Sequence, residues 1–170
     1  LDVLLVNKAA LQAIRQEYLN KPKTLSPYLS ATLKEARLAL GVKPVSVVDK
    51  EVLPPSGDKH DYFSIAPYWW PDSTKKDGLP YIRRDGQINP ERYKTGDREK
   101  VRTLNTSVFT LSLAYYITGD EIFAAHAVRF LQTWFLNPDT RMNPNLNYAQ
   151  AIKGLNEGRG TGIIDTHDFI

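Results

Sequence analysis

Three adjacent aromatic residues have side chains suited to binding a ligand. Tyr68, Trp69 and Trp70 lie between Pro67 and Pro71, and the two prolines stiffen the segment. Flat aromatic faces stack on the C–H faces of sugar rings, and their phenol and indole groups offer hydrogen bonds. The segment is therefore a candidate carbohydrate-binding loop. The alternative, in which these side chains only hold their own loop against the core, stays open.

A second segment carries an arginine between two glycines. Gly158 and Gly160 would allow the backbone at Arg159 to approach a ligand closely. The guanidinium is permanently charged, and its planar fork binds a carboxylate through two parallel hydrogen bonds. Neutral groups that could contact the same ligand lie in this loop: Asn147, Tyr148, Gln150 and Asn156. Asn, Pro and Gly also make ordinary turns, and Arg159 could instead brace its own loop against Glu157 or Asp165.

Asn105 and His167 complete the candidate residues. Asn105 lies in the segment 102–107, where an amide in the first turns of a helix needs a partner, either a ligand or a loop carbonyl. His167 is the only histidine expected in the ligand groove and the single catalytic candidate in the chain, whereas His126 should be packed and His60 solvated. Without cysteine or an HExxH spacing, no metal site is expected.

Helical periodicity and capping residues predict the elements that carry these segments. The expected helices span about 3–19, 26–40, 97–118, 120–136 and 162–170. Long connections fill 42–96 and 137–161, and the other connections are short, so both long loops should lie at the same end of antiparallel hairpins. The sequence therefore predicts an all-α fold, an incomplete (α/α) toroid with long loops on one face, in which residues 1–170 belong to one domain.

Five helices do not close such a ring. The apolar residues at the start of the last expected helix have no later helix to cover them: Ile163, Ile164, Phe169 and Ile170. We therefore expect residues 1–170 to be the N-terminal part of a longer protein, with its C-terminal part as a partner. The alternative is a small helical domain that ends in a short docked segment.

Composition excludes several classes of protein. The 170 residues are 42% apolar, have a net charge of +3 and include no cysteine. No apolar run reaches the roughly 18 to 20 residues that cross a bilayer, and no basic tract typical of nucleic-acid binding is present. These features exclude a membrane span, wholesale disorder and disulfides, and they give no support to a nucleic-acid partner. Because the chain begins at Leu1 without a basic leader, we expect a processing or trimming event, of which signal-peptide cleavage is one form.

Several short segments together resemble a known family. They are 62–64 (Tyr-Phe-Ser), 67–72 (Pro-Tyr-Trp-Trp-Pro-Asp), 102–107 (Arg-Thr-Leu-Asn-Thr-Ser), 147–150 (Asn-Tyr-Ala-Gln) and 158–160 (Gly-Arg-Gly). In these motifs the chain, from about residue 60 onward, resembles the alginate lyase superfamily of (α/α)-toroid polysaccharide lyases. The resemblance implies β-elimination in an acidic polysaccharide such as alginate or glucuronan, by a secreted or periplasmic enzyme that needs no cofactor. It also implies that the aromatic part of the loop 42–96 acts as a lid over the sugar chain.

The implied chemistry makes specific demands on side chains. The C6 carboxylate must be neutralised, a base must remove the C5 proton, and an acid must protonate the departing O4. By the resemblance, Arg159 and Asn105 are expected to meet carboxylate or hydroxyl groups. The family's Asn-Asn-His stretch with a later Tyr is not found in these residues, so the proton-transfer residues are expected beyond Ile170.

Two other functions remain open at this point. A helical glycan-binding protein without catalysis would need only the aromatic platform. A glycoside hydrolase would need two carboxylates across a groove, for which Asp72, Glu157 and Asp165 are available.

Overall fold

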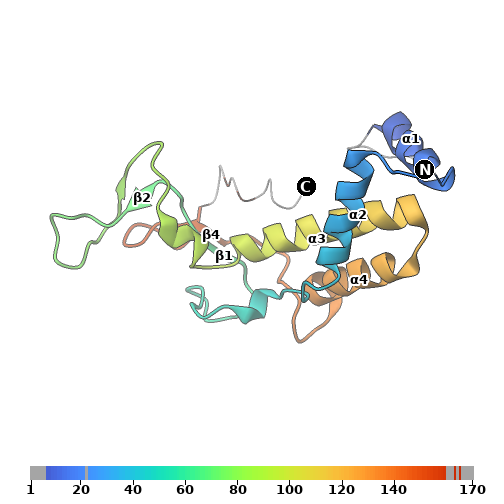
Figure 1. Ribbon diagram of the computed structural model, residues 1–170. Helices are drawn as coiled ribbons and strands as arrows, with labels where there is room; N and C mark the ends of the chain where they lie inside the picture. The colour runs from blue at the N-terminus through green and yellow to red at the C-terminus, as the bar shows by residue number, and fades with distance from the viewer. Residues whose placement is uncertain (1–6, 22, 160–162, 164, 166–170) are drawn as a thin grey trace. The chain divides into compact units, whose positions relative to one another are not determined.

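The structure is a computed structural model of the chain (Figure 1). The residues that it describes are 7–21, 23–159, 163 and 165. The chain divides into two compact units, the first made of Leu1–Pro44 and Thr106–Leu131, the second of Val45–Asn105 and Gln132–Ile170. The division falls within helix α3 (Arg98–Thr118) and at the end of helix α4 (Glu121–Leu131). None of the helices in the described ranges is long and apolar enough to cross a membrane.

The first unit is helical, and local capping explains where its first two helices begin. These are α1 (Lys8–Leu19) and α2 (Pro27–Ala39). The Asn7 side chain accepts a hydrogen bond from the Ala10 amide at 3.1 Å, and the Ser26 hydroxyl accepts one from the Leu29 amide at 3.3 Å. Each cap satisfies an amide that has no partner within its helix, so the residues just before the apolar stripes set the helix starts.

Buried apolar residues of α2, α3 and α4 form the core of the first unit. They include Leu29, Leu33, Ala36, Leu111, Ala114, Ile117, Phe123, Ala127 and Phe130. His126 packs against this core, because its Nε2 lies 2.9 Å from the Val42 carbonyl oxygen and its ring meets the Phe130 ring edge-on at 5.4 Å. The prediction that His126 is a packed residue is confirmed.

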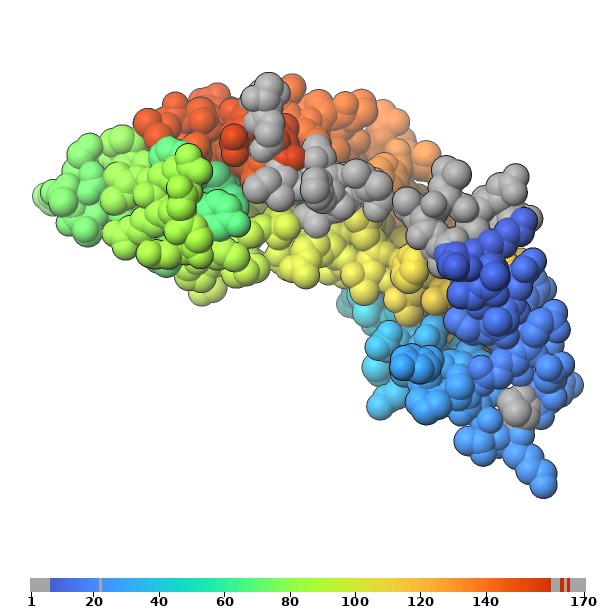
Figure 2. Space-filling view, turned by 90° about the horizontal axis from the view of Figure 1, so that it is seen from above, coloured from blue at the N-terminus to red at the C-terminus, as the bar shows by residue number. Residues whose placement is uncertain are grey.

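The second unit contains short strands in two small sheets. Strand β1 (Phe63–Ile65) pairs in parallel with β4 (Tyr148–Ala151), and β2 (Trp69–Trp70) pairs antiparallel with β3 (Ile82–Arg83). The 3-10 helices η1 (Val47–Asp49) and η2 (Pro90–Tyr93) and a π-helix (Gln132–Leu136) lie in the same unit. The segments around β1 and β4 are far apart in the sequence but lie side by side, as the green and red parts of Figure 2 show.

The predicted all-α fold, including its assignment to a helical toroid, is therefore wrong. Four strands and two sheets lie in the segments that were expected to be loops, and the fold is mixed. The physical reason is length: strands of two to four residues are too short to show an alternating pattern. Their stability comes from pairing partners that are distant in the sequence, such as Phe63 with Tyr148, which local periodicity does not reveal.

The structure also tests the predicted helices. The helices expected at 26–40 and 97–118 are confirmed as α2 and α3. The helix expected at 120–136 ends as an α-helix at Leu131 and continues as the π-helix, where the Asn137 amide donates to the Gln132 carbonyl at 2.8 Å. The first expected helix is described from Lys8 onward, and the one expected at 162–170 lies outside the described residues except for Ile163 and Asp165.

A buried ion pair fixes the start of α3 beside β1. Lys50 Nζ lies 2.7 Å from Asp97 Oδ2, and the two side chains are only 1% and 0% exposed. Lys50 also donates to the backbone carbonyls of Lys59 and Asp61, and Asp97 accepts from the Phe63 amide at 3.0 Å. Burial is the largest influence on both groups, lowering the pKa of Lys50 and raising the pKa of Asp97. The pair therefore connects η1, β1 and α3 into one frame.

Candidate functional site

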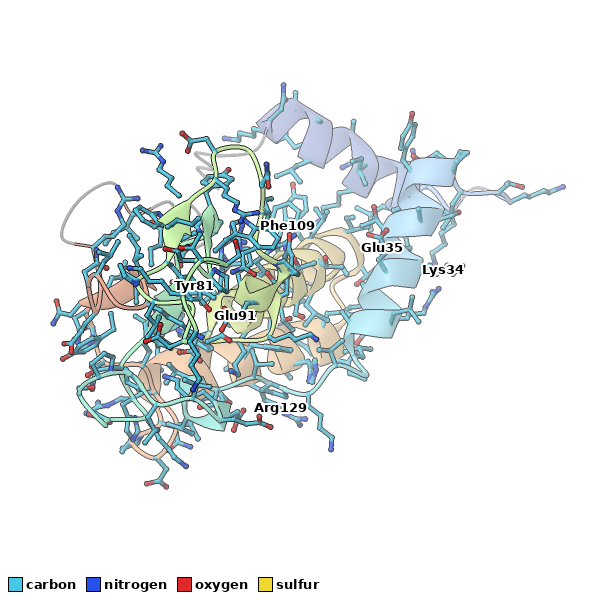
Figure 3. The ribbon with its side chains drawn as sticks, turned by 90° about the vertical axis from the view of Figure 1, so that its left-hand side faces the viewer. Lys34, Glu35, Tyr81, Glu91, Phe109 and Arg129 are labelled. Atoms are coloured by element: carbon cyan, nitrogen blue, oxygen red, sulfur yellow. The ribbon has the colours of Figure 1, made fainter. Side chains whose placement is uncertain are left out.

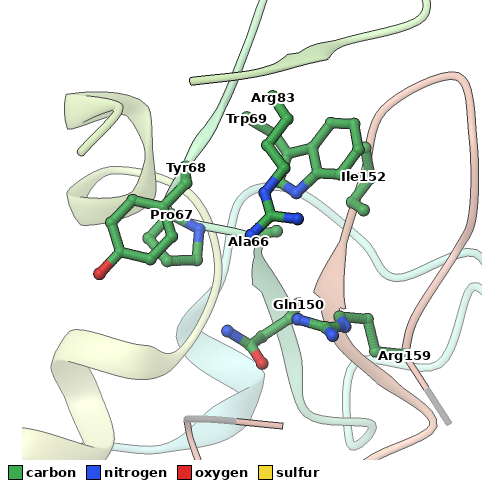
Figure 4. Close-up of a pocket in the computed structure, with 8 residues that line it drawn as sticks. All are labelled: Ala66, Pro67, Tyr68, Trp69, Arg83, Gln150, Ile152 and Arg159. Atoms are coloured by element: carbon green, nitrogen blue, oxygen red, sulfur yellow. The ribbon is translucent and has the colours of Figure 1, made fainter. Parts of the chain in front are cut away.

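A pocket of about 170 Å³ lies in the second unit, between the β2–β3 hairpin and strand β4 (Figure 4). It is lined by Ala66, Pro67, Tyr68 and Trp69, by Arg83 of β3, and by Gln150, Ile152 and Arg159. Two segments singled out in the sequence, the aromatic one and the Gly-Arg-Gly one, thus contribute to a single cavity. None of the described residues that line it is acidic, and two of them carry a guanidinium.

Gly158 explains how Arg159 reaches this pocket. A Cβ atom at position 158 would lie 1.9 Å from the Asn147 carbonyl oxygen and 2.8 Å from the Tyr148 Cα, so only glycine allows the chain to pass β4 this closely. The Arg159 amide then donates to the Ala149 carbonyl at 2.9 Å. No side chain in the described ranges receives a hydrogen bond or an ion pair from the Arg159 guanidinium. The backbone holds this residue in place while its charge stays available to a ligand.

The aromatic side of the pocket is held by the hairpin. Trp69 and Arg83 are directly opposite each other across β2 and β3, and the Arg84 amide donates to the Tyr68 carbonyl at 2.8 Å. The Asn89 side chain donates to the Trp69 carbonyl at 2.9 Å. These bonds fix the backbone of the aromatic segment, and the half-buried side chains of Tyr68 and Trp69 keep one surface accessible.

The floor of the pocket contains an irregular strand. Between the pairs Phe63–Tyr148 and Ile65–Ala151, β4 advances three positions where β1 advances two, so β4 bulges. Gln150, in this bulge, is fully buried and has φ of 52°, a left-handed conformation that a residue other than glycine seldom adopts. A bulge redirects a side chain, and such features concentrate at functional sites.

The buried carboxylate of Asp165 stabilises this bulge through the Ser64 hydroxyl. The Gln150 amide donates to the Ser64 hydroxyl at 2.9 Å, and Ser64 in turn donates to Asp165 Oδ2. Tyr62 donates to the same carboxylate at 2.9 Å, and Arg98 Nε does so at 3.1 Å. Burial and the neighbouring Asp165 raise the pKa of Tyr62 well above its ordinary value, so the phenol remains a donor. Asp165 is therefore a structural acceptor for residues in and beside β1 and for Arg98 of α3.

The other predicted residues lie in different surroundings. Trp70 is not among the lining residues, and its indole donates to the Gln87 carbonyl at 2.9 Å. Tyr148 packs against the small core of β1 and β4, and Asn147 is exposed beside Gly158. Asn105 is half-buried in α3 and does not line this pocket. His167 lies outside the described residues.

Arg83 is the charged lining residue that the sequence does not point to, and Ala66 and Ile152 are apolar lining residues of the same kind. A long connection without helical periodicity gives no local signal for where its residues lie. The available signal was a Tyr-Ile-Arg-Arg run at 81–84 followed by Asp85 and Gly86, which is typical of a short strand that enters a turn.

The acids needed by a glycoside hydrolase are not gathered at this pocket. Asp165 is occupied by its three donors, and Glu157 is exposed and does not line the cavity. Asp72 accepts hydrogen bonds from the hydroxyl and amide of Thr74, which hold the pKa of its carboxyl below the ordinary value. Within the described ranges, no group of three or more His, Asp or Glu side chains could hold a metal ion.

Comparison with known proteins gives a consistent family assignment. The sequence model of the alginate lyase family matches residues 46–170. The crystal structure of an alginate lyase from Bacteroides ovatus, solved at 1.60 Å resolution, is similar with a TM-score of 0.86 and 48% sequence identity. The match covers 95% of this chain and 42% of that one, and no curated protein matches the chain. Because the family match includes most of the sequence and the whole of the pocket, the chain belongs to the alginate lyase family.

Proposed function

We propose that this chain forms part of a polysaccharide lyase that cleaves a uronic-acid polymer, alginate or glucuronan, by β-elimination. The observation that carries the proposal is the pocket in which an aromatic face, Trp69, and a positive charge without a protein partner in the described ranges, Arg159, lie together. A sugar ring needs the first and its carboxylate needs the second. Membership of the alginate lyase family supports the same class of reaction. The chain spans 42% of the length of the Bacteroides ovatus protein, so the proposal concerns an activity to which these residues contribute.

The role proposed for Arg159 follows from the chemistry of elimination. The C5 proton of a uronate is weakly acidic while the neighbouring carboxylate carries a full negative charge. A guanidinium that binds both carboxylate oxygens neutralises that charge and stabilises the electron density that develops there when the proton leaves.

The residues that transfer protons are proposed to lie outside residues 1–170. No histidine is among the described residues that line the pocket, and the sequence contains no Asn-Asn-His stretch. Tyr68 supplies the only phenol in the described lining, and we assign it to substrate contact together with Trp69. On this proposal, the pocket binds and orients a uronate residue while groups from elsewhere in the protein remove the C5 proton and protonate O4.

Product analysis tests this proposal. The full-length gene product is incubated with alginate and with glucuronan, and both ultraviolet absorbance and new reducing ends are measured. β-Elimination leaves a conjugated, unsaturated uronate, so absorbance should rise in step with reducing ends. New reducing ends without absorbance would indicate hydrolysis and reject the proposal. Binding of the polymer without new ends would instead favour a glycan-binding protein.

We also propose that the protein acts in the periplasm or outside the cell, where a polymeric substrate is accessible. The support is the size of the substrate, since a long polyanion does not cross a bilayer unaided. Cell fractionation with an antibody against the protein tests this, and recovery only in the cytoplasm would contradict it.

A further inference from the structure

The β2–β3 hairpin has two pairs of a tryptophan and an arginine, and the two arginines have different surroundings. Trp69 and Arg83 are opposite each other on the two strands and share the face that lines the pocket. Successive residues of a strand point to opposite faces, so Trp70 belongs to the other face. There the Arg84 guanidinium lies 5.7 Å from the centre of the Trp70 ring, a cation–π contact. One arginine therefore stacks on its own hairpin, and the other lines the cavity.

The Arg83 guanidinium has an acidic partner at Nε, whereas its terminal Nη groups have none among the described residues. Asp85 accepts a hydrogen bond from Arg83 Nε at 2.6 Å, and no partner for the terminal Nη groups is found among the described residues. The side chain is 65% exposed, so solvent screens this ion pair and it neutralises the guanidinium only in part. Figure 4 shows Arg83 reaching from β3 into the space that Arg159 enters from the other side.

The base of the hairpin is anchored to the segment after β4. The Tyr81 hydroxyl donates to Glu91 at 2.7 Å, and Lys153 forms an ion pair with the same carboxylate; Figure 3 shows Tyr81 and Glu91 close together. The Tyr81 amide donates to the Lys153 carbonyl at 2.9 Å. A Cβ atom at Gly154 would lie 2.7 Å from the Pro80 Cα, so the two segments are in backbone contact. These contacts set the separation of β3 from β4, and hence of Arg83 from Arg159.

We propose that Arg83 is a second carboxylate-binding residue of this pocket and determines its specificity for acidic over neutral sugars. Two guanidinium groups line one small cavity that has no acidic residue in its described lining, so an anion that enters the cavity has two positively charged groups to bind. A uronate carboxylate supplies that anion, with Arg159 and Arg83 as its two partners and the Trp69 ring beside the sugar. This inference rests on the proposed function for the identity of the anion.

The size of the cavity limits the ligand. Pockets for drug-sized ligands enclose roughly 300 to 1,000 Å³. A cavity of about 170 Å³ is about half the lower figure, which suits a single sugar residue of a chain. Arg83 and Arg159 therefore act on the carboxylate of one uronate residue.

Binding measurements on the full-length gene product test the inference without any need for turnover. The probes are the methyl glycoside of a single uronate, which has no sugar at O4 to eliminate, and the carboxyl-reduced form of the same glycoside. Dissociation constants are measured by calorimetry for the wild type, R83A, R83K and the matched control R84A. Loss of one charge-assisted contact should weaken binding of the uronate by about tenfold in R83A, and R83K should recover part of the loss.

The carboxyl-reduced glycoside separates recognition from a general structural effect. It should bind the wild type and R83A equally, because the group that Arg83 recognises is gone. R84A should bind the uronate as the wild type does. An equal loss of affinity for the uronate in R83A and R84A would overturn the inference. So would a loss of affinity in R83A that is equal for both glycosides. A wild type that binds neither glycoside would also overturn it. If the wild type releases no unsaturated product but the uronate-specific loss in R83A is observed, the proposed elimination fails and the assignment of Arg83 stands.

Discussion

At the scale of single residues, Gly158 and Arg159 form a functional pair. The glycine brings the backbone within contact distance of Asn147 and Tyr148, and the arginine then projects from a backbone bonded to Ala149. Position and charge are therefore supplied by different residues. Substitutions at the two positions should consequently have different effects on folding and on activity.

Replacement of Arg159 should affect activity and leave stability unchanged. In the R159A variant of the full-length gene product, kcat/KM should fall by about tenfold to a hundredfold, the equivalent of a charge-assisted pair of roughly 1.5 to 3 kcal/mol. Because no described side chain depends on the guanidinium for a hydrogen bond, the melting temperature should stay close to that of the wild type. Initial rates and thermal melts of the same preparations provide the measurement.

R159K serves as the control for charge alone. It keeps a positive charge and loses the planar fork, so it should recover only part of the activity. A melting temperature that falls in proportion to activity in R159A would identify Arg159 as a brace for its loop and contradict its assignment to the substrate.

Replacement of Gly158 should have the opposite pattern. In G158A the new methyl group would overlap the Asn147 carbonyl, and the overlap can be relieved only if the segment moves away from β4. We expect a loss of stability of roughly 1 to 3 kcal/mol, as for other overpacked sites, together with reduced activity because Arg159 moves as well. The matched control is G41A, where the nearest atom would lie at 3.4 Å. Urea denaturation of both variants tests this, and equal midpoints would contradict it.

At the scale of elements, the Lys50–Asp97 pair determines how α3 meets β1. In D97N the Lys50 ammonium would remain buried without its counter-charge, and such a change costs about 3 to 5 kcal/mol. We therefore expect a clear fall in the denaturation midpoint. K75A provides the comparison, because the exposed Lys75 ammonium lies 3.9 Å from Asp72 and the loss of this long contact should cost less than about 1 kcal/mol. Similar denaturation midpoints for D97N and K75A would show that the buried pair does not hold α3 against β1.

The elements also show how far local sequence carries information about this fold. The bounds of α2 and α3 could be predicted because Ser26, Pro27 and a repeating apolar stripe are local signals. The strands could not, because β1 pairs with β4 across most of the second unit and because Gln150 adds an irregular step to their register. A pairing that depends on distant partners leaves little trace in the spacing of neighbouring residues.

The same distinction applies to the pocket. Tyr68, Trp69 and Arg159 could be identified because aromatic side chains and a Gly-Arg-Gly sequence have few structural roles that require them together. Arg83 could not, since its role depends on lying opposite Trp69 in a two-residue strand pair. The lining role of Gln150 depends in the same way on a bulge that only the pairing creates.

At the scale of the whole molecule, charge should affect how the protein meets a polyanion. The chain carries a net charge of +3, and its pocket has two guanidinium groups and no acidic residue in the described lining. Exposed charges are screened over about 10 Å at 0.1 M salt, so KM for a uronate polymer should rise several-fold between about 0.05 and 0.5 M NaCl. The value of kcat should change little, because salt screening weakens the association of the polymer with the protein before it affects the chemical step.

The salt dependence has an internal control in the R83A variant. With one guanidinium removed, KM should start higher and rise less steeply with salt. A KM that does not change with ionic strength in the wild type would show that the pocket charges do not contribute to polymer binding.

The parallel pairing of β1 with β4 also has a consequence for biosynthesis. Trp69 leaves the ribosome well before Arg159 and the strand that completes the pocket are made. At about 5 to 20 residues per second, the delay between the two is on the order of 5 to 20 seconds. During this interval the apolar strand β1 lacks its partner β4, which makes the nascent chain a substrate for chaperones that shield exposed strands. Slower translation of the segment between β3 and β4 should therefore lower the yield of folded protein without changing its final stability.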